Sequence, residues 1–217
     1  MAASLRLNHD PNAPAYWQEA CEALASRNPV WAELVNRHSD RALRSRGAPF
    51  ETMLRSLVGQ QISVKAADAV WGRVVDALNG QISSQAVLAL SDDTLKATGL
   101  SRQKIAYSRA LSEFEQGGGL KLELLAALDD EACTRHLCEI KGVGRWTAQM
   151  FLMFCLRRPD VWPVDDIGVQ RGISRQFFEG EPIGPKEALQ FGEKLKPWRT
   201  VAAWYLWRSL DPAVVDY

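Results

Sequence analysis

Two places along the chain carry residues that could do chemistry: a glycine turn at residues 142–144 and an adjacent pair of aspartates, Asp165 and Asp166. A carboxylate in a cleft can orient or deprotonate water, and it can stabilise positive charge on a substrate. Gly142 and Gly144 permit a tight turn with positive φ and let a foreign backbone approach closely. The amides that open the next helix, together with its dipole, form a site for a phosphate oxygen. The turn therefore suits contact with a nucleic-acid backbone.

A glycine pair alone is weak evidence for a binding turn, because many helices simply end at glycine. The residues downstream change that balance. The helix expected at 145–156 rises roughly 18 Å, and the extended segment 157–164 spans at most about 28 Å. The chain can therefore double back, which would place Asp165 and Asp166 beside Trp146 in one cleft with the turn.

Helical periodicity runs through the whole sequence, and nothing in it is typical of a β-sheet. The predicted helices cover residues 16–27, 29–38, 49–60, 63–78, 84–90, 92–100, 102–116, a run that ends at 128, 129–140, 145–156, 167–178, 185–195 and 198–210. No linker is long enough to separate independent domains. We therefore predict an all-α chain, a single domain over residues 1–217 with two helical lobes and a hairpin motif at 129–156.

Composition narrows the classes of function without choosing one. Lys and Arg number 26 and Asp and Glu also number 26, so contact with nucleic acid must rest on local patches. No apolar run approaches the roughly 18 residues of a membrane span, and the first residues lack the apolar length of a secretion signal. The four cysteines and three histidines show no metal-ligand spacing. We expect a protein of the cytoplasm, at the bacterial nucleoid, or of the nucleus, which is not secreted and has no membrane contact or side-chain metal site.

Several motifs together resemble one family. The hairpin and aspartate segments read GVGRWTA and VWPVDDIGVQRGI, and they resemble the signature of the helix-hairpin-helix (HhH-GPD) DNA glycosylase superfamily. Its upstream helix pair, its glycine-serine-basic segment and its last core helix resemble LVGQQISVKAADAVWGRV, TGLSRQKIAYSRAL and KPWRTVAAWYLWR. Together these segments cover most of residues 49–208. The chain resembles the DNA-3-methyladenine glycosylase II group, in a compact form without an N-terminal sheet domain.

The resemblance implies a two-lobed helical fold with an interlobe active-site cleft. It also implies an enzyme of base excision repair that flips and hydrolytically removes alkylated purines, such as 3-methyladenine and 7-methylguanine, from DNA. Asp166 matches the family's catalytic carboxylate, which leaves Asp165 to cap or support the next helix. The alternative is that one of the two aspartates merely caps a helix that begins near Ile167. Trp146 stands where bifunctional members carry a nucleophilic lysine, so AP-lyase activity is not expected.

Aromatic residues are candidates for a base pocket. By resemblance, Trp146 and Trp198 line the pocket, where ring faces attract an alkylated purine that carries positive charge. Met150 lies one helical turn after Trp146 and either faces the pocket or fills the core. Trp204 and Trp207 lie at helical spacing near the end of the chain and are predicted to be core.

The predicted DNA contacts begin at the turn between two upstream helices. By resemblance, Gln61 fills the gap that an extruded base leaves, and its amide could hydrogen-bond the partner base. Alternatively, Gln60 and Gln61 cap a helix that begins at Ile62. The remaining contacts are predicted at the hairpin turn and the helix after it: Gly142, Val143, Gly144, Arg145, Trp146 and Thr147.

A local basic segment at residues 101–109 holds no acidic side chain, although the chain has no net charge. Arg102, Lys104 and Arg109 could form a face that contacts DNA phosphates. The alternative is a solvated helix face, which is the usual role of such charge runs.

The resemblance implies no organic cofactor. Family members hold a monovalent cation through hairpin carbonyls, and the matching residues here are Cys138, Ile140 and Val143, where sodium or potassium would bridge to phosphate. The expected partner is damaged double-stranded DNA, bound by a monomer. One rival function is the same fold acting on oxidised, deaminated or mismatched bases. Another is a non-catalytic DNA-binding module that keeps Asp166 only as a helix cap.

Overall fold

The computed structural model describes residues 12–45 and 47–210. Within them every regular element is a helix and no β-strand occurs, which confirms the predicted all-α class. The helices of this part of the chain are α1 (Trp17–Ala25), α2 (Pro29–Arg37), α3 (Pro49–Gly59), α4 (Val64–Ala77), α5 (Ser84–Ala89), α6 (Asp92–Ala97), α7 (Arg102–Gln116), α8 (Leu122–Ala127), α9 (Asp130–Leu137), α10 (Arg145–Phe154), α11 (Ile167–Phe177), α12 (Pro185–Glu193) and α13 (Arg199–Leu210).

The described residues fall into two compact units. The terminal unit combines the described parts of residues 1–45 and 157–216 and holds α1, α2 and α11 to α13. The central unit holds α3 to α10. Two units agree with the predicted number of lobes, whereas the prediction of a single domain over 1–217 stays a prediction.

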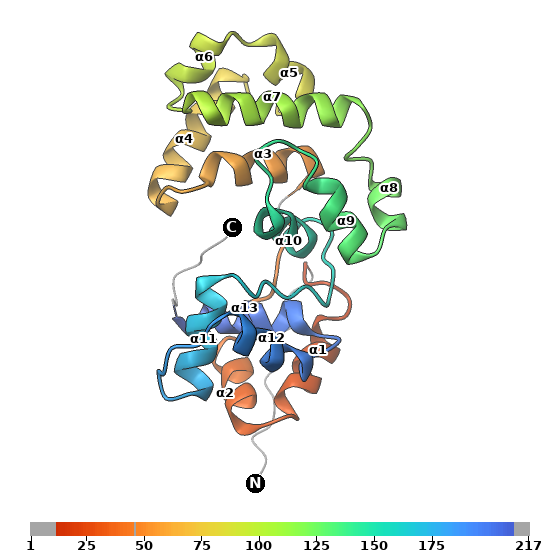
Figure 1. Ribbon diagram of the computed structural model, residues 1–217, viewed down its shortest axis with the longest axis vertical. Helices are drawn as coiled ribbons and strands as arrows, with labels where there is room; N and C mark the ends of the chain where they lie inside the picture. Colours follow the sequence, from red (N-terminus) through yellow and green to blue (C-terminus); the bar gives the residue numbers. More distant parts are fainter. Residues whose placement is uncertain (1–11, 46, 211–217) are drawn as a thin grey trace. The chain divides into compact units, whose positions relative to one another are not determined.

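The central unit is organised around α3 and α7, which pack against each other (Figure 1). The short helices α5 and α6 pack on α7, and α10 packs on both α3 and α9. Serine side chains that accept a backbone N–H begin the helices α4 to α7, at Ser63, Ser83, Ser91 and Ser101. Local capping therefore sets where these helices start, and α3 carries the turn before α4 into contact with α7 and α10.

The terminal unit is organised around α13, whose residues from Thr200 to Leu206 are all buried. Helices α1, α2 and α11 pack on it. At the crossing of α11 and α13, a Cβ on Gly172 would lie 2.8 Å from the Cβ of Leu206, so only glycine allows this approach. Helix α11 therefore packs closely on α13, and Asp166 lies at the N-terminus of α11.

Each predicted helix is present, and the differences lie at the helix ends. The helix predicted at 129–140 ends at Leu137, because the next residues form tight turns. In these turns the N–H of Glu139 donates to the carbonyl of His136, and the N–H of Ile140 donates to the carbonyl of Leu137. Among the described residues, none of the helices combines the length and the hydropathy that crossing a membrane requires.

Candidate functional site

Asp166 is the N-cap residue of α11 in the terminal unit. Its Oδ1 accepts the backbone N–H of Val169 at 2.7 Å and the indole N–H of Trp207, on α13, at 2.8 Å. The carboxylate is half-buried, whereas Asp165 beside it is exposed. Two donors on one oxygen hold the carboxylate in a fixed orientation, as a group that acts on a reacting centre requires.

Two expectations about this segment need correction. The capping role expected of Asp165 is wrong, because the cap is Asp166, as the alternative allowed, whereas a supporting role of Asp165 stays a prediction. The prediction that Trp207 is core is wrong as well, although Trp204 is buried to 3% exposure as expected. Trp207 is only half-buried, and its N–H bonds to the carboxylate. Sequence offers no signal for this pair, because 41 positions separate the two residues.

Gly168 leaves room for the contact between Asp166 and Trp207. A Cβ at this position would lie 2.8 Å from Cδ1 of the Trp207 ring and 3.0 Å from Oδ1 of Asp166. The first distance is too short for a carbon atom and the second is unusually tight, so a side chain here would displace the indole from the carboxylate. The first turn of α11 is therefore built around this hydrogen bond.

The hairpin turn lies in the central unit, and its two glycines differ. Gly142 has φ +93°, and a Cβ there would lie 2.3 Å from the Tyr107 ring, so conformation and space both require glycine. Gly144 is the N-cap of α10 with φ −95°, a conformation open to any residue. A Cβ on Gly144 would meet no atom within 4 Å. Of this pair, only Gly142 has the predicted positive φ, while Gly144 leaves open space at the start of α10.

The Arg145 side chain is held against α9 by hydrogen bonds to a carboxylate. Its guanidinium donates to both carboxylate oxygens of Glu131, at 2.9 and 2.7 Å. This hydrogen bonding, more than the charge itself, holds the pKa of Glu131 below its usual value. Both side chains are more than half exposed, so the pair contributes little to stability. The effect of the ion pair is to hold the Arg145 guanidinium in one orientation, against Glu131.

Neutralising Glu131 tests whether Arg145 can contact DNA. We expect Glu131→Gln to tighten binding of a labelled duplex severalfold at low salt, because a neutral partner competes less with a DNA phosphate for the Arg145 guanidinium, and phosphate contact releases counterions. Fluorescence anisotropy over a salt series measures the change. Glu123→Gln, an exposed position on α8, makes the same change in net charge and is the control. Equal tightening by both variants would mean that only net charge matters.

The turn before α4 is tied to the hairpin through Gln60. Its Nε2 donates to the carbonyl of Gly142 at 3.0 Å and to Oγ1 of Thr147 at 3.2 Å. Gln61, the next residue, is exposed and has φ +58°. Ser63 caps α4 by accepting the N–H of Ala66, so the alternative that Gln60 and Gln61 cap a helix beginning at Ile62 is wrong.

The predicted basic face at residues 101–109 is largely engaged in internal contacts. Arg109 donates to the carbonyls of Val87, Leu88 and Leu90 at the end of α5, so its assignment to an open basic face is wrong. Lys104 donates to the carbonyl of Val58 at 2.7 Å, and burial lowers the pKa of its ammonium. Arg102 is exposed, and its phosphate contact stays a prediction.

The predicted pocket residues are distributed over both units. Trp146 is half-buried in the central unit, and Met150 is buried to 3% exposure in α10, as its core interpretation expects. Trp198 is half-buried in the terminal unit and stacks on Tyr16, with ring centroids 5.8 Å apart. A pocket formed by these residues, and the return of the chain that would bring Asp166 to the hairpin, stay predictions.

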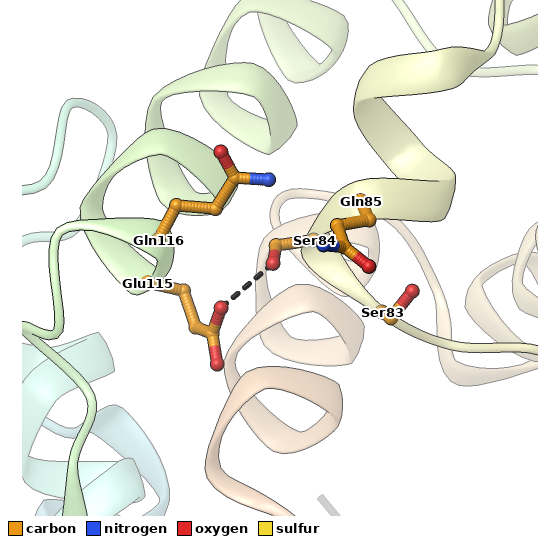
Figure 2. Close-up of a pocket in the computed structure, with 5 residues that line it drawn as sticks. All are labelled: Ser83, Ser84, Gln85, Glu115 and Gln116. Atoms are coloured by element: carbon orange, nitrogen blue, oxygen red, sulfur yellow. Dashed lines mark hydrogen bonds between the residues drawn. The ribbon is translucent and has the colours of Figure 1, made fainter.

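A hollow in the central unit contains none of the predicted site residues. It lies between the start of α5 and the end of α7 and is lined by Ser83, Ser84, Gln85, Glu115 and Gln116 (Figure 2). The hydroxyl of Ser84 donates to the Glu115 carboxylate at 2.7 Å. This bond gives the carboxylate a structural partner. No cluster of His, Cys, Asp or Glu that could hold a metal ion occurs among the described residues.

A match to a family model shows which family the chain belongs to. It belongs to the HhH-GPD superfamily of base excision DNA repair proteins, whose family model matches residues 54–197. The matched segment includes the glycine turn, the aspartate that caps α11 and the basic segment of α7. The family predicted from the sequence motifs is therefore confirmed.

Known relatives and solved structures agree with this membership. The Schizosaccharomyces pombe protein named DNA-3-methyladenine glycosylase 1 is 32% identical over 195 residues, which cover 86% of this chain and 84% of that protein. A structure of the S. pombe 3-methyladenine DNA glycosylase in complex with abasic DNA has a TM-score of 0.79 at 30% identity and covers 92% of this chain and 98% of its own. A crystal structure of DNA-3-methyladenine glycosidase from Bacillus halodurans has a TM-score of 0.78 at 33% identity and covers 88% of each chain.

Proposed function

We propose that this chain is a monofunctional DNA glycosylase that flips alkylated purines, such as 3-methyladenine and 7-methylguanine, out of double-stranded DNA and removes them hydrolytically. The observation that carries the proposal is the carboxylate of Asp166, held by two N–H donors at the start of α11. The names of the relatives from S. pombe and B. halodurans support the substrate class.

Asp166 has the chemistry that base removal needs. Cleavage of an N-glycosidic bond moves the bonding electrons onto the departing base and leaves positive charge on the sugar. A carboxylate anion stabilises that charge, and it can also orient the attacking water or accept its proton. A purine that already carries positive charge from alkylation leaves as a neutral base, so its bond breaks more easily. The fixed carboxylate of Asp166 would therefore supply the negative charge that cleavage of the glycosidic bond requires.

Removing the indole N–H tests the orientation of this carboxylate. We expect Trp207→Phe to lower the single-turnover rate of base release about 10- to 100-fold, because a misdirected group loses rate steeply. Affinity for duplex DNA with an abasic site should change by less than about twofold. Trp71→Phe, on α4 of the central unit, is the matched control. A wild-type rate for Trp207→Phe would show that the indole does not orient Asp166.

Two tryptophans are proposed to contact the extruded base. The ring faces of Trp146 and Trp198 would attract a cationic purine more strongly than a neutral one, which favours damaged bases. Tyr16 stacks on Trp198 and restricts the ring's motion. Met150 would contribute to this pocket only if its buried side chain becomes accessible on binding.

The absence of lyase chemistry rests on Trp146. An indole cannot form a Schiff base with an abasic sugar, and by resemblance Trp146 would take the place of the lysine of bifunctional family members. The product would therefore be an intact strand with an abasic site. Strand cleavage without added alkali would contradict this assignment.

The DNA interface is proposed to centre on the open start of α10. Gly144 leaves space for a phosphate oxygen beside the first turn of that helix, where the helix dipole favours an anion. Gln61 would enter the gap left by the extruded base. Val143 is buried to 5% exposure, so its contribution would come from its main chain.

A monovalent cation would fit the chemistry of the hairpin. Main-chain carbonyls of Cys138, Ile140 and Val143 are neutral oxygen ligands that follow the C-terminal, negative end of α9. The carbonyl of Ile140 also accepts the N–H of Val143 at 2.9 Å, which holds the turn closed. Bound sodium or potassium would supply positive charge to a DNA phosphate.

Incubation of the purified protein with methylated DNA tests the proposed function. We expect 3-methyladenine and 7-methylguanine to appear as free bases, identified by chromatography, with the strand intact. Release of a different damaged base from defined duplexes would instead assign the chain to another lesion class. Binding to damaged DNA without release of any base would favour a non-catalytic module.

A further inference from the structure

The Gln60 side chain connects two turns that lie far apart in the sequence. Its amide N–H groups reach the carbonyl of Gly142, 82 positions away, and the hydroxyl of Thr147, 87 positions away. Gln60 is the C-cap residue that follows α3, and the exposed Gln61 comes directly after it. Gln61, the proposed gap-filling residue, therefore directly follows the residue that bonds to the proposed phosphate-binding turn.

Helix α7 supports the same two turns from one of its faces. Lys104 donates to the carbonyl of Val58 in the last turn of α3, at 2.7 Å. Tyr107, three positions further along α7 and on the same face, packs its ring where a Cβ of Gly142 would lie. Burial lowers the pKa of Lys104, which agrees with an ammonium directed to the protein interior. Gln60, Lys104 and Tyr107 thus hold the two turns together.

The conformation of Gln61 makes this support necessary. A residue other than glycine with φ near +58° is strained by roughly 1–2 kcal/mol, and it keeps that conformation only when its neighbours impose it. The bonds of Gln60 and Lys104 fix the backbone immediately before Gln61. We expect the turn to relax without these bonds, which would change the direction of the Gln61 side chain.

We propose that Gln60 is a positioning residue, which fixes Gln61 relative to the hairpin turn so that phosphate contact and gap filling occur together. The proposal rests on the proposed function, because it takes Gln61 as the residue that enters the DNA. The competing interpretation is that Gln60 only satisfies the polar groups of Gly142 and Thr147. The two differ in whether the effect of Gln60 requires the Gln61 side chain.

A double-mutant cycle separates these interpretations. The variants are Gln60→Ala, Gln61→Ala and the combination, and Gln85→Ala on α5 is the control that should bind as wild type does. Fluorescence anisotropy gives the affinity for a duplex with a tetrahydrofuran abasic analogue and for the intact duplex. The ratio of the two affinities, the abasic preference, is the readout because it cancels general losses of DNA binding.

We expect each single variant to lower the abasic preference about 5- to 10-fold, and the combination to lower it no further than Gln61→Ala does. Independent effects that multiply in the combination would overturn the proposal. So would a Gln61→Ala variant with wild-type preference, because Gln60 would then have no gap-filling residue to place. Thermal denaturation of all four proteins checks that they are folded.

Gln60→Glu provides a second test if the alanine variant folds poorly. It keeps the length of the side chain but cannot donate a hydrogen bond to the Gly142 carbonyl when ionised. We expect the same loss of preference as in Gln60→Ala, whereas a wild-type preference would contradict the proposal. Base release by the wild-type protein is measured separately. If the protein releases bases but the effects of Gln60→Ala and Gln61→Ala are independent, only the positioning role of Gln60 is rejected. If the two residues are coupled but the wild-type protein releases no base, only the assignment as a glycosylase is rejected.

Discussion

Asp166→Asn is expected to abolish base release while leaving DNA binding in place. The asparagine carbonyl can still accept the N–H groups of Val169 and Trp207, and asparagine caps helices about as well as aspartate. The negative charge is lost, and the other carboxylate oxygen becomes an NH2 group, which donates hydrogen bonds and cannot accept a proton from water. Because that charge would stabilise the developing cation, we expect the single-turnover rate on methylated DNA to fall at least about 10³-fold. Affinity for abasic duplex should stay within severalfold of wild type.

The neighbouring aspartate makes a matched control for this experiment. Asp165 is exposed and is not the cap of α11, so Asp165→Asn should release bases at the wild-type rate. Thermal denaturation of both variants would verify that the cap is intact. If Asp166→Asn releases base as fast as wild type, its carboxylate is only a helix cap and the proposed mechanism fails.

The helices could be predicted because their signals are local. Ser101 and the glycines after Gln116 enclose the segment 102–116, and α7 has those ends in the structure. Pro49 in the same way opens α3. The class of fold and the position of Asp166 at a helix start follow from such neighbours, without knowledge of the tertiary structure.

The partners of the polar side chains could not be predicted from the sequence. Arg109 has the same local pattern whether it meets solvent or, as here, the carbonyls that end α5. The pairing of Trp207 with Asp166, and of Gln60 with Gly142, depends on how helices pack after they form. Periodicity specifies which face of a helix is apolar, but it does not specify which distant N–H group meets a given oxygen.

Alanine substitutions at Gly142 and Gly144 are expected to have opposite consequences. Alanine at the positive φ of Gly142 costs about 1–2 kcal/mol, and displacing the Tyr107 ring costs roughly 1–3 kcal/mol more. For a chain of this size the melting temperature should fall by roughly 5–15 °C, measured by circular dichroism. Gly144→Ala has an allowed φ and open space, so its melting temperature should stay within about 2 °C of wild type.

The second variant should nevertheless bind DNA poorly. The new methyl group would occupy the space that a phosphate oxygen needs beside α10, so we expect affinity for abasic duplex to fall about 10-fold or more. Gly72→Ala on α4, where a Cβ also meets nothing within 4 Å, should change neither property adversely. Wild-type affinity in the Gly144→Ala variant would mean that no DNA phosphate binds at the start of α10. The loss of binding without loss of stability would instead identify Gly144 as a glycine required by the ligand, and Gly142 as one required by the fold.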